Sequence, residues 1–305
     1  MNRNHLPRHV RVVEVGPRDG LQNQPAIIST EHKVEWIRRL ASAGLREIEA
    51  TAFVHPKWVP QLADAERVAR ALAAAGVALP SALVPNVKGL ERALETGLRR
   101  FALFTAASQT FSQKNTNCSI EESFARFDEV FERLAAIEDD VWVRGYISTC
   151  FGCPYEGDVP VARVVEVAVR LYDMGVSEIA ISDTTGVAFP RAVHEVVEAV
   201  AARVPRERIA LHFHDTRGQA LVNVYAGLEV GIHTFDAAAG GLGGCPYAPG
   251  AAGNLATEDL VTLLDSLQIE TGVDRALLAE ANLWFETLLP SPLPSRVLAT
   301  YRGKS

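Results

Sequence analysis

One pattern recurs five times along the chain: an apolar-periodic stretch ends, a glycine follows, and a short β-type run begins within a few residues. The five stretches read ASAGLREIEA, AAAGVALPSAL, LETGLRRFALF, YDMGVSEIAIS and LEVGIHTFDAA. Glycine suits the position just after a helix because it adopts the left-handed backbone conformation without steric cost. We therefore expect helices that end beside Gly44, Gly76, Gly97, Gly175 and Gly231, each followed by a strand.

The stretches before these glycines have the spacing of amphipathic helices. Between residues 160 and 174, for example, Val161, Val164, Ala168 and Leu171 fall on one helical face. The stretches after the glycines are short and apolar, which is typical of buried parallel strands. Strands that alternate with helices predict a parallel sheet.

The expected strands lie near residues 11–15, 46–51, 78–83, 99–104, 142–148, 177–182, 208–214 and 233–236. The expected helices lie near residues 31–43, 62–75, 87–96, 121–138, 160–174, 190–202, 217–230 and 255–267. Eight such units favour a (β/α)₈ TIM barrel, whose usual size is ~250 residues. A doubly wound open sheet is the alternative, but no G-x-G-x-x-G follows the first strand. We expect one domain over residues 1–305, with a barrel over about 10–268 and extra C-terminal helices over about 269–305.

Composition excludes several classes of protein. The chain has 305 residues and a net charge of −7, with arginines scattered among acidic residues, so no nucleic-acid or anionic-membrane surface is expected. No apolar run reaches the ~18 residues of a membrane span. The N-terminal stretch lacks the features of a signal peptide, and four cysteines in a chain of this length do not make a disulfide framework. A cytoplasmic location is therefore expected.

Polar residues gather where the expected strands end, and in a β/α barrel the active site is built at the C-terminal ends of the strands. These candidates are Arg18 and Asp19 after the first strand, Glu49 on the second, Asp183 at the end of the sixth, His212, His214 and Asp215 at the end of the seventh, and Cys245 and Asn254 in the loop after the eighth.

The sharpest local feature is the sequence HFH at the end of the seventh strand. Side chains alternate along a strand, so His212 and His214 point to the same face and could bind one metal ion. Asp19 and Asn254 come from neighbouring strands of a closed barrel. Imidazole, carboxylate and amide ligands suit Mg²⁺ or Mn²⁺, whereas zinc remains an alternative if Cys245 is a ligand.

Arg18 and Asp19 follow a Gly-Pro turn. They could form an ordinary surface ion pair, or Arg18 could stabilise an oxyanion that develops beside the metal. Glu49 and Asp183 could orient Arg18 or support the metal ligands, or be ordinary carboxylates at strand ends.

The remaining cysteines carry weaker signals. Cys150 and Cys153 form a C-x-x-C sequence but lack a thioredoxin-type context, so redox chemistry is not favoured. Cys118 precedes a capping-box sequence that begins at Ser119 or Ser123, which favours a structural role.

Six motifs together resemble the 3-hydroxy-3-methylglutaryl-CoA lyase family. They are VEVGPRDGLQNQ, FVHPKWVPQLAD, QKNTNCSIEES, GCPYEGD, HFHDTRGQALVN and GLGGCPYAPGAAGNLATEDLV, in order from about residue 10 to 275. The first and fifth also resemble, more weakly, a wider superfamily of metal-dependent acyl lyases and Claisen synthases. The glycine-rich last motif is more specific to the lyases.

The resemblance implies a lyase of bacterial, cytoplasmic type that cleaves 3-hydroxy-3-methylglutaryl-CoA into acetoacetate and acetyl-CoA in leucine degradation. It implies an acyl-CoA substrate, a divalent Mg²⁺ or Mn²⁺ ion and a possible homodimer. The implied metal ligands are Asp19, His212, His214 and Asn254, and the implied catalytic residues are Arg18, Glu49, Asp183, His212 and Cys245, with Arg18 also binding substrate. The alternatives are a related lyase or Claisen-type synthase for another 3-hydroxyacyl-CoA or 2-oxo acid, and a non-catalytic metal- or CoA-binding barrel.

Overall fold

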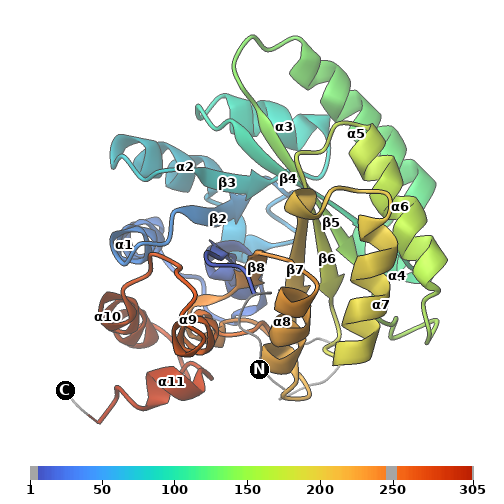
Figure 1. The fold of residues 1–305 in the computed structure, drawn as a ribbon. Helices are drawn as coiled ribbons and strands as arrows, with labels where there is room; N and C mark the ends of the chain where they lie inside the picture. Colours follow the sequence, from blue (N-terminus) through green and yellow to red (C-terminus); the bar gives the residue numbers. More distant parts are fainter. Residues whose placement is uncertain (1–5, 245–252, 304–305) are drawn as a thin grey trace.

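Eight parallel strands close into a barrel in a computed structural model that describes residues 6–244 and 253–303 (Figure 1). The strands follow one another around the barrel in chain order, and β1 pairs with β8 to close it. The strands are β1 (Arg11–Glu14), β2 (Glu47–Ala52), β3 (Pro80–Leu83), β4 (Arg100–Ala106), β5 (Trp142–Ser148), β6 (Glu178–Asp183), β7 (Ile209–Phe213) and β8 (Thr234–Ala237). The predicted TIM barrel is thus confirmed, and the open-sheet alternative is excluded.

Helices alternate with the strands and surround the barrel (Figure 1). They are α1 (Thr30–Ser42), α2 (Ala65–Ala74), α3 (Val87–Leu94), α4 (Gln109–Thr116), α5 (Ile120–Ala135), α6 (Val161–Asp173), α7 (Pro190–Ala201), α8 (Ala220–Glu229) and α9 (Thr257–Ser266). The sequence reading missed α4, whose polar sequence QTFSQKNT has no clear apolar face. This helix begins because the Ser108 side chain accepts a hydrogen bond from the Phe111 N–H (3.1 Å).

The glycines of the repeated pattern adopt the conformation expected of them. Their φ angles are all positive, at 100° for Gly44, 68° for Gly76, 87° for Gly97, 91° for Gly175 and 82° for Gly231. Gly44 also has a packing role, because a Cβ added there would lie 2.1 Å from the carbonyl oxygen of Gly272. A glycine at this position lets the end of α1 approach the segment that follows α9.

Two further helices, α10 (Arg275–Glu286) and α11 (Arg296–Ala299), pack on one side of the barrel beside α1 and α9 (Figure 1). Trp36 of α1 stacks on Phe285 of α10, with ring centroids 3.8 Å apart, and donates a hydrogen bond to Asn282 Oδ1 (2.8 Å). These contacts attach α10 to the barrel. The division of residues 1–305 into one domain stays a prediction.

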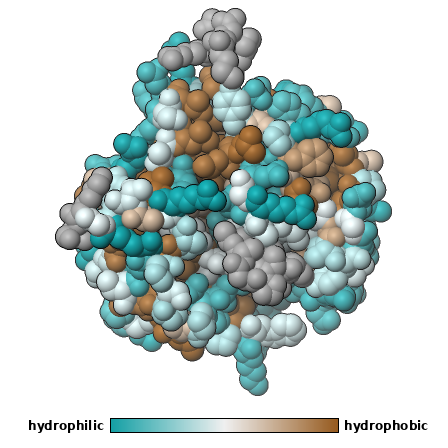
Figure 2. All heavy atoms as spheres, turned by 90° about the horizontal axis from the view of Figure 1, so that it is seen from below, coloured by the Kyte–Doolittle hydropathy of each residue, from teal (hydrophilic) through white to brown (hydrophobic). Residues whose placement is uncertain are grey.

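The surface of the molecule is mixed in character. Figure 2 shows hydrophilic side chains spread over one face, with hydrophobic side chains in patches between them. Among the described residues, no helix is both long enough and apolar enough to cross a membrane.

Candidate active site

The turn after β1 brings Arg18 and Asp19 to the mouth of the barrel. Residues Gly16–Gly20 form a wide helical turn in which the N–H groups of Arg18 (3.1 Å) and Asp19 (2.7 Å) both donate to the Val15 carbonyl. The turn packs closely at Gly16, where an added Cβ would lie 2.7 Å from the Glu14 carboxylate and 3.2 Å from the Ala239 backbone nitrogen. The local sequence GPRDG therefore fixes two adjacent polar side chains at the end of one strand.

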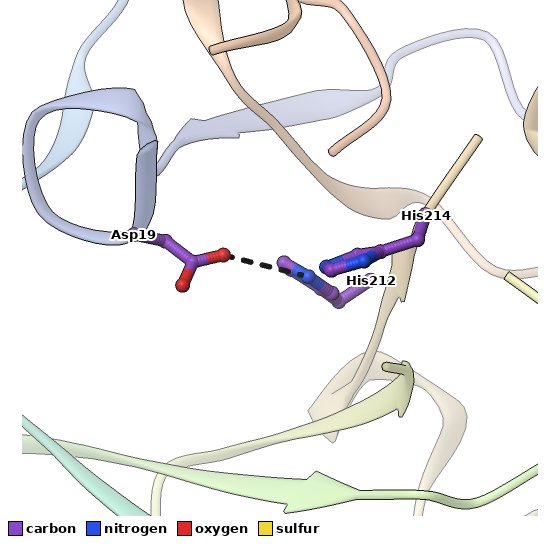
Figure 3. A group of neighbouring side chains, drawn as sticks. All are labelled: Asp19, His212 and His214. Carbon is purple, nitrogen blue, oxygen red and sulfur yellow. Dashed lines mark ion pairs between the residues drawn. The ribbon is translucent and has the colours of Figure 1, made fainter. Parts of the chain in front are cut away.

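The two histidines at the end of β7 face Asp19 across the barrel mouth (Figure 3). Their ring centroids are 5.3 Å apart, and both side chains are buried. His212 Nε2 lies 3.8 Å from Asp19 Oδ2. One ligand atom from each of Asp19, His212 and His214 can be chosen so that all three lie within 4.8 Å of one another. Three of the four predicted metal ligands thus form one cluster.

Asn254 reaches the same region because its backbone lies along the end of β7. The Leu255 N–H donates to the Phe213 carbonyl (3.0 Å), and the Asp215 N–H donates to the Gly253 carbonyl (2.7 Å). The Asn254 side chain donates through Nδ2 to the Leu242 carbonyl (3.2 Å). A Cβ on Gly243 would lie 2.7 Å from that Nδ2 atom. A glycine at position 243 therefore lets the backbone pass close to the Asn254 side chain.

The protonation and hydrogen bonding of this cluster fit a divalent metal. Among the described residues, His214 Nδ1 and Asn254 Oδ1 are buried without a hydrogen-bond partner. Burial, helped by the neighbouring His212, lowers the pKa of His214 to about 4, so its imidazole is neutral and able to ligate. Burial alone would raise the pKa of Asp19, but Arg18 and the histidines outweigh it and lower that pKa. Unpaired nitrogen and oxygen atoms beside a carboxylate are the ligands that such an ion needs.

Arg18 is buried, with 5% of its surface exposed, which excludes an ordinary surface ion pair. Its Nη1 donates to Asp19 Oδ1 (2.9 Å), and its Nε donates to Glu49 Oε1. Burial alone would lower the pKa of Arg18, but the carboxylates of Glu49 and Asp19 raise it well above its usual value. The site therefore holds a permanent buried cation beside the metal cluster.

Tyr146 on β5 is a member of the site that the sequence reading missed. Its hydroxyl donates to Glu49 Oε2 (2.9 Å) and accepts a hydrogen bond from Arg144 Nη1 (3.2 Å). The Arg18 guanidinium lies 5.4 Å from the centroid of its ring. Burial raises the pKa of Tyr146 well above its usual value, so the hydroxyl stays protonated. Strand alternation, which puts Arg144 and Tyr146 on one face of WVRGYIS, is the signal that could have found it.

Asp183 lies at the end of β6, but its described hydrogen bonds go to the following loop. It accepts from the N–H groups of Val187 (2.9 Å) and Ala188 (3.0 Å). Burial raises its pKa to about 6. In the described part of the chain no hydrogen bond or ion pair joins Asp183 to Arg18, and its predicted support of the site stays a prediction.

The cysteines divide into two groups. Cys118, Cys150 and Cys153 are buried free thiols, and the capping box that follows Cys118 begins at Ser119. Cys150 and Cys153 contact different partners, the Ile147 carbonyl and the Ser108 hydroxyl, which agrees with a structural role. Cys245 lies outside the described residues.

Comparisons with known proteins agree with the geometry. The HMGL-like family model matches residues 9–283. A hydroxymethylglutaryl-CoA lyase of Bacillus subtilis is 48% identical over 97% of this chain and 99% of its own. A Pseudomonas aeruginosa protein, named as a 3-hydroxy-3-isohexenylglutaryl-CoA/hydroxymethylglutaryl-CoA lyase, is 51% identical over 91% of this chain and 92% of its own.

Solved structures give the same result. The crystal structure of hydroxymethylglutaryl-CoA lyase from Pseudomonas aeruginosa superposes with a TM-score of 0.94 at 48% identity, and the match covers 99% of this chain and 100% of that one. A hydroxymethylglutaryl-CoA lyase of Acinetobacter baumannii, solved with coenzyme A and 3-methylmalate, has a TM-score of 0.90 at 39% identity over 96% and 95% of the two chains. With nearly the whole chain matched at this level, the protein belongs to the HMGL-like family of carbon–carbon lyases.

Proposed function

We propose that this chain cleaves 3-hydroxy-3-methylglutaryl-CoA into acetoacetate and acetyl-CoA. The observation that carries the proposal is the cluster of Asp19, His212 and His214 at the barrel mouth with the buried Arg18 cation beside it. Family membership over nearly the whole chain supports the same reaction. Relatives named for this substrate do not favour the alternative of a Claisen-type synthase.

The residues that would hold the metal are Asp19, His212, His214 and Asn254. Their mixture of oxygen and neutral nitrogen atoms, without a thiolate among the described side chains, supports Mg²⁺ or Mn²⁺ rather than zinc. When bound, the ion supplies Lewis-acid polarisation of substrate oxygens.

The reaction breaks the bond between C2 and C3 of the acyl chain. The tertiary hydroxyl at C3 loses its proton, and its oxygen becomes the new carbonyl of acetoacetate as the C2–C3 electron pair moves onto C2 to form the enolate of acetyl-CoA. Arg18 stabilises that developing negative charge, because it is a fixed cation in a site of low dielectric. Glu49 anchors the guanidinium through Nε and Asp19 through Nη1. Nη2 donates no hydrogen bond to the residues that the structure describes, so it is the atom that would face substrate.

Two proton transfers complete the cycle. The predicted bases for the hydroxyl proton are Cys245 and His212. A His212 that would bind the metal through Nε2 while Nδ1 donates to Asp236 (3.1 Å) has no free lone pair, which favours Cys245. A proton returned to C2 converts the enolate into acetyl-CoA. A thiol with a reference pKa of ~8.5 can serve as acid or base near neutrality when nearby charge shifts it modestly. Loss of turnover in a Cys245→Ala variant with unchanged metal binding would support the role of the thiol, and full turnover would remove it.

The test is an assay of the purified protein after removal of metal with EDTA. Addition of Mg²⁺ or Mn²⁺ should restore cleavage of 3-hydroxy-3-methylglutaryl-CoA, with acetoacetate and acetyl-CoA formed in equal amounts. A parallel assay with a thioester that has a longer branch at C3 measures the size of the acyl pocket. No acetoacetate with either ion rejects the proposal. Light scattering of the same preparation tests the possible homodimer that the family resemblance implies.

A further inference from the structure

The ring of His212 is held from behind by a buried carboxylate. Its Nδ1 lies 3.1 Å from Asp236 Oδ2, and the Asp236 side chain has no exposed surface. A carboxylate accepts hydrogen bonds only, so the proton of the neutral imidazole belongs on Nδ1. The lone pair is then on Nε2, which is the atom that faces Asp19.

Asp236 is in turn fixed by an arginine that crosses the barrel interior. Arg144 of β5 donates from Nη2 to Asp236 Oδ1 (2.6 Å), and only 2% of its side chain is exposed. A buried guanidinium that pairs with a buried carboxylate resists movement, because loss of either partner leaves an uncompensated charge. The two carboxylate oxygens of Asp236 therefore have different partners: Oδ1 accepts from Arg144, and Oδ2 contacts His212.

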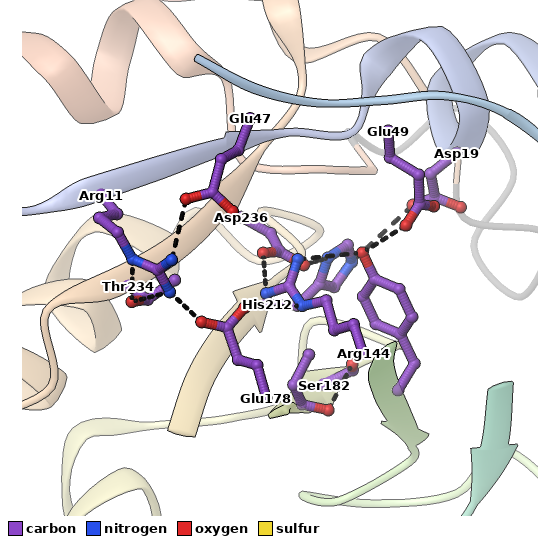
Figure 4. Close-up of polar contacts among 12 residues, drawn as sticks. Arg11, Asp19, Glu47, Glu49, Arg144, Glu178, Ser182, His212, Thr234 and Asp236 are labelled. Atoms are coloured by element: carbon purple, nitrogen blue, oxygen red, sulfur yellow. Dashed lines mark hydrogen bonds and ion pairs between the residues drawn. The ribbon is translucent and has the colours of Figure 1, made fainter. Parts of the chain in front are cut away.

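The same arginine connects the histidine to the other half of the site (Figure 4). Arg144 Nη1 donates to the Tyr146 hydroxyl (3.2 Å), and that hydroxyl donates to Glu49 Oε2 (2.9 Å). Glu49 accepts from Arg18, and Arg18 donates to Asp19 (2.9 Å). These polar contacts thus connect His212 to Asp19 through residues on four strands or strand ends. Asp19 Oδ2 in turn lies 3.8 Å from His212 Nε2, so the contacts form a ring.

We propose that the Arg144–Asp236 ion pair is a positioning unit, which sets the tautomer of His212 and orients its Nε2 toward the metal site. Through Tyr146 and Glu49, the same unit also fixes the position of the Arg18 guanidinium beside that site. The proposal rests on the metal site of the proposed function and extends it to two residues that touch neither the ion nor the substrate. Partners of this kind usually change metal affinity or activity about 10- to 100-fold when they are replaced.

A purely structural role for the pair is the competing explanation, and the barrel provides a control for it. Arg11 lies at the opposite end of the strands and contacts Glu47 (2.8 Å), Glu178 and Thr234 (3.0 Å). Its side chain is 42% exposed. It shares Glu178 with Arg144, whose Nε lies 3.2 Å from Glu178 Oε1, but in the described part of the chain it contacts neither Asp236, His212 nor Tyr146. An Arg11→Met variant therefore removes the ion pairs with Glu47 and Glu178 at the far end of the barrel, while the contacts of Asp236 with Arg144 and His212 remain.

The experiment measures Mn²⁺ binding by titration calorimetry on the purified protein without substrate, together with the thermal midpoint of the metal-free protein. In Asp236→Asn the amide NH₂ can face Nδ1 and move the imidazole proton to Nε2, so Mn²⁺ affinity should fall about 10- to 100-fold. The ¹⁵N NMR shifts of His212 in the metal-free protein should report the changed tautomer. Arg11→Met should lower the thermal midpoint while Mn²⁺ affinity stays as in the wild type.

The double variant Arg144→Met/Asp236→Asn serves if a single substitution prevents folding, because it removes both charges of the pair. Glu178, which lies 3.2 Å from Arg144 Nε, keeps its ion pair with Arg11 in this variant. Wild-type Mn²⁺ affinity in Asp236→Asn or in the double variant overturns the positioning role, as does an equal loss of affinity in Arg11→Met. These outcomes leave the proposed function intact. Failure of the wild-type protein to bind Mn²⁺ or Mg²⁺ rejects the proposed metal site and this inference with it.

Discussion

Arg18 Nη1 donates a hydrogen bond to Asp19 Oδ1 at 2.9 Å, so adjacent residues of one turn join the buried cation to the carboxylate of the metal cluster. These two residues are adjacent in sequence. The other edge of the guanidinium is held by Glu49 of β2, which lies far from them in the chain. The guanidinium is therefore held between two carboxylates before any substrate arrives.

Replacement of Arg18 tests whether the cation acts mainly in the transition state. In Arg18→Ala we expect kcat to fall by about 10²- to 10³-fold, the usual cost of losing one preorganised donor to an oxyanion, with a much smaller change in KM. Steady-state kinetics at saturating Mg²⁺ measures both constants. A rise in KM with kcat unchanged would mean that Arg18 serves binding alone.

Replacement of Asp19 tests the ligand set. Asp19→Asn keeps the shape of the side chain but removes the charge, so the Mg²⁺ concentration needed for half-maximal activity should rise about 10-fold or more. The matched control is Asp139→Asn, which alters an exposed aspartate paired with Arg99 away from the cluster. An unchanged Mg²⁺ requirement in Asp19→Asn would remove this residue from the ligands.

The hydroxyl of Tyr146 is expected to matter because it joins Glu49 to Arg144. Tyr146→Phe leaves Glu49 Oε2 without its described donor, and kcat should fall about 10- to 100-fold as the anchor of Arg18 loosens. Tyr172→Phe, on the half-buried face of α6, is the control for the loss of a tyrosine hydroxyl. Equal kcat in the two variants would argue against the connection.

The buried carboxyl of Glu14 should make stability depend on pH. Glu14 accepts hydrogen bonds from the N–H groups of Gly16 and Ala239 (2.8 Å each) and from the Thr257 hydroxyl (2.7 Å). Burial raises its pKa from 4.5 to about 8, although these hydrogen bonds lower it in part. Burial likewise raises the pKa of Glu258, to about 7.

A carboxyl whose pKa is raised on folding stabilises the native state fully below its unfolded pKa and loses that contribution as the pH rises through its folded pKa. Glu14 and Glu258 should therefore make the free energy of unfolding fall as the pH rises from about 5 to about 8, by at most about 1.4 kcal/mol per unit of pKa shift. His214, whose pKa is lowered to about 4, acts in the opposite direction and offsets part of this fall below its unfolded pKa of 6.5. Urea denaturation across this range measures it. Glu14→Gln should flatten the profile, whereas Glu280→Gln on exposed surface should not. An equally steep profile in Glu14→Gln would contradict the prediction.

Local sequence was sufficient for the barrel and for part of the site. The alternation of helix, glycine and strand depends on the periodicity of apolar residues and on the backbone freedom of residues such as Gly44. Both properties can be recognised in short stretches of sequence. The HFH sequence places His212 and His214 on one face for the same reason, since strand alternation is a local property. The short helix α4 was not predicted, because its mostly polar sequence has no helical periodicity of apolar residues.

The connections between these residues were decided only by the tertiary structure. Arg144, Tyr146, Asp236 and Glu49 come from β5, β8 and β2, and their side chains meet only when the strands close around a common interior. A charged residue in an apolar strand does not by itself reveal its partner. The sequence by itself determined the barrel and the residue types at its mouth. Barrel closure decided which buried charges pair, because that pairing depends on register between strands far apart in the chain.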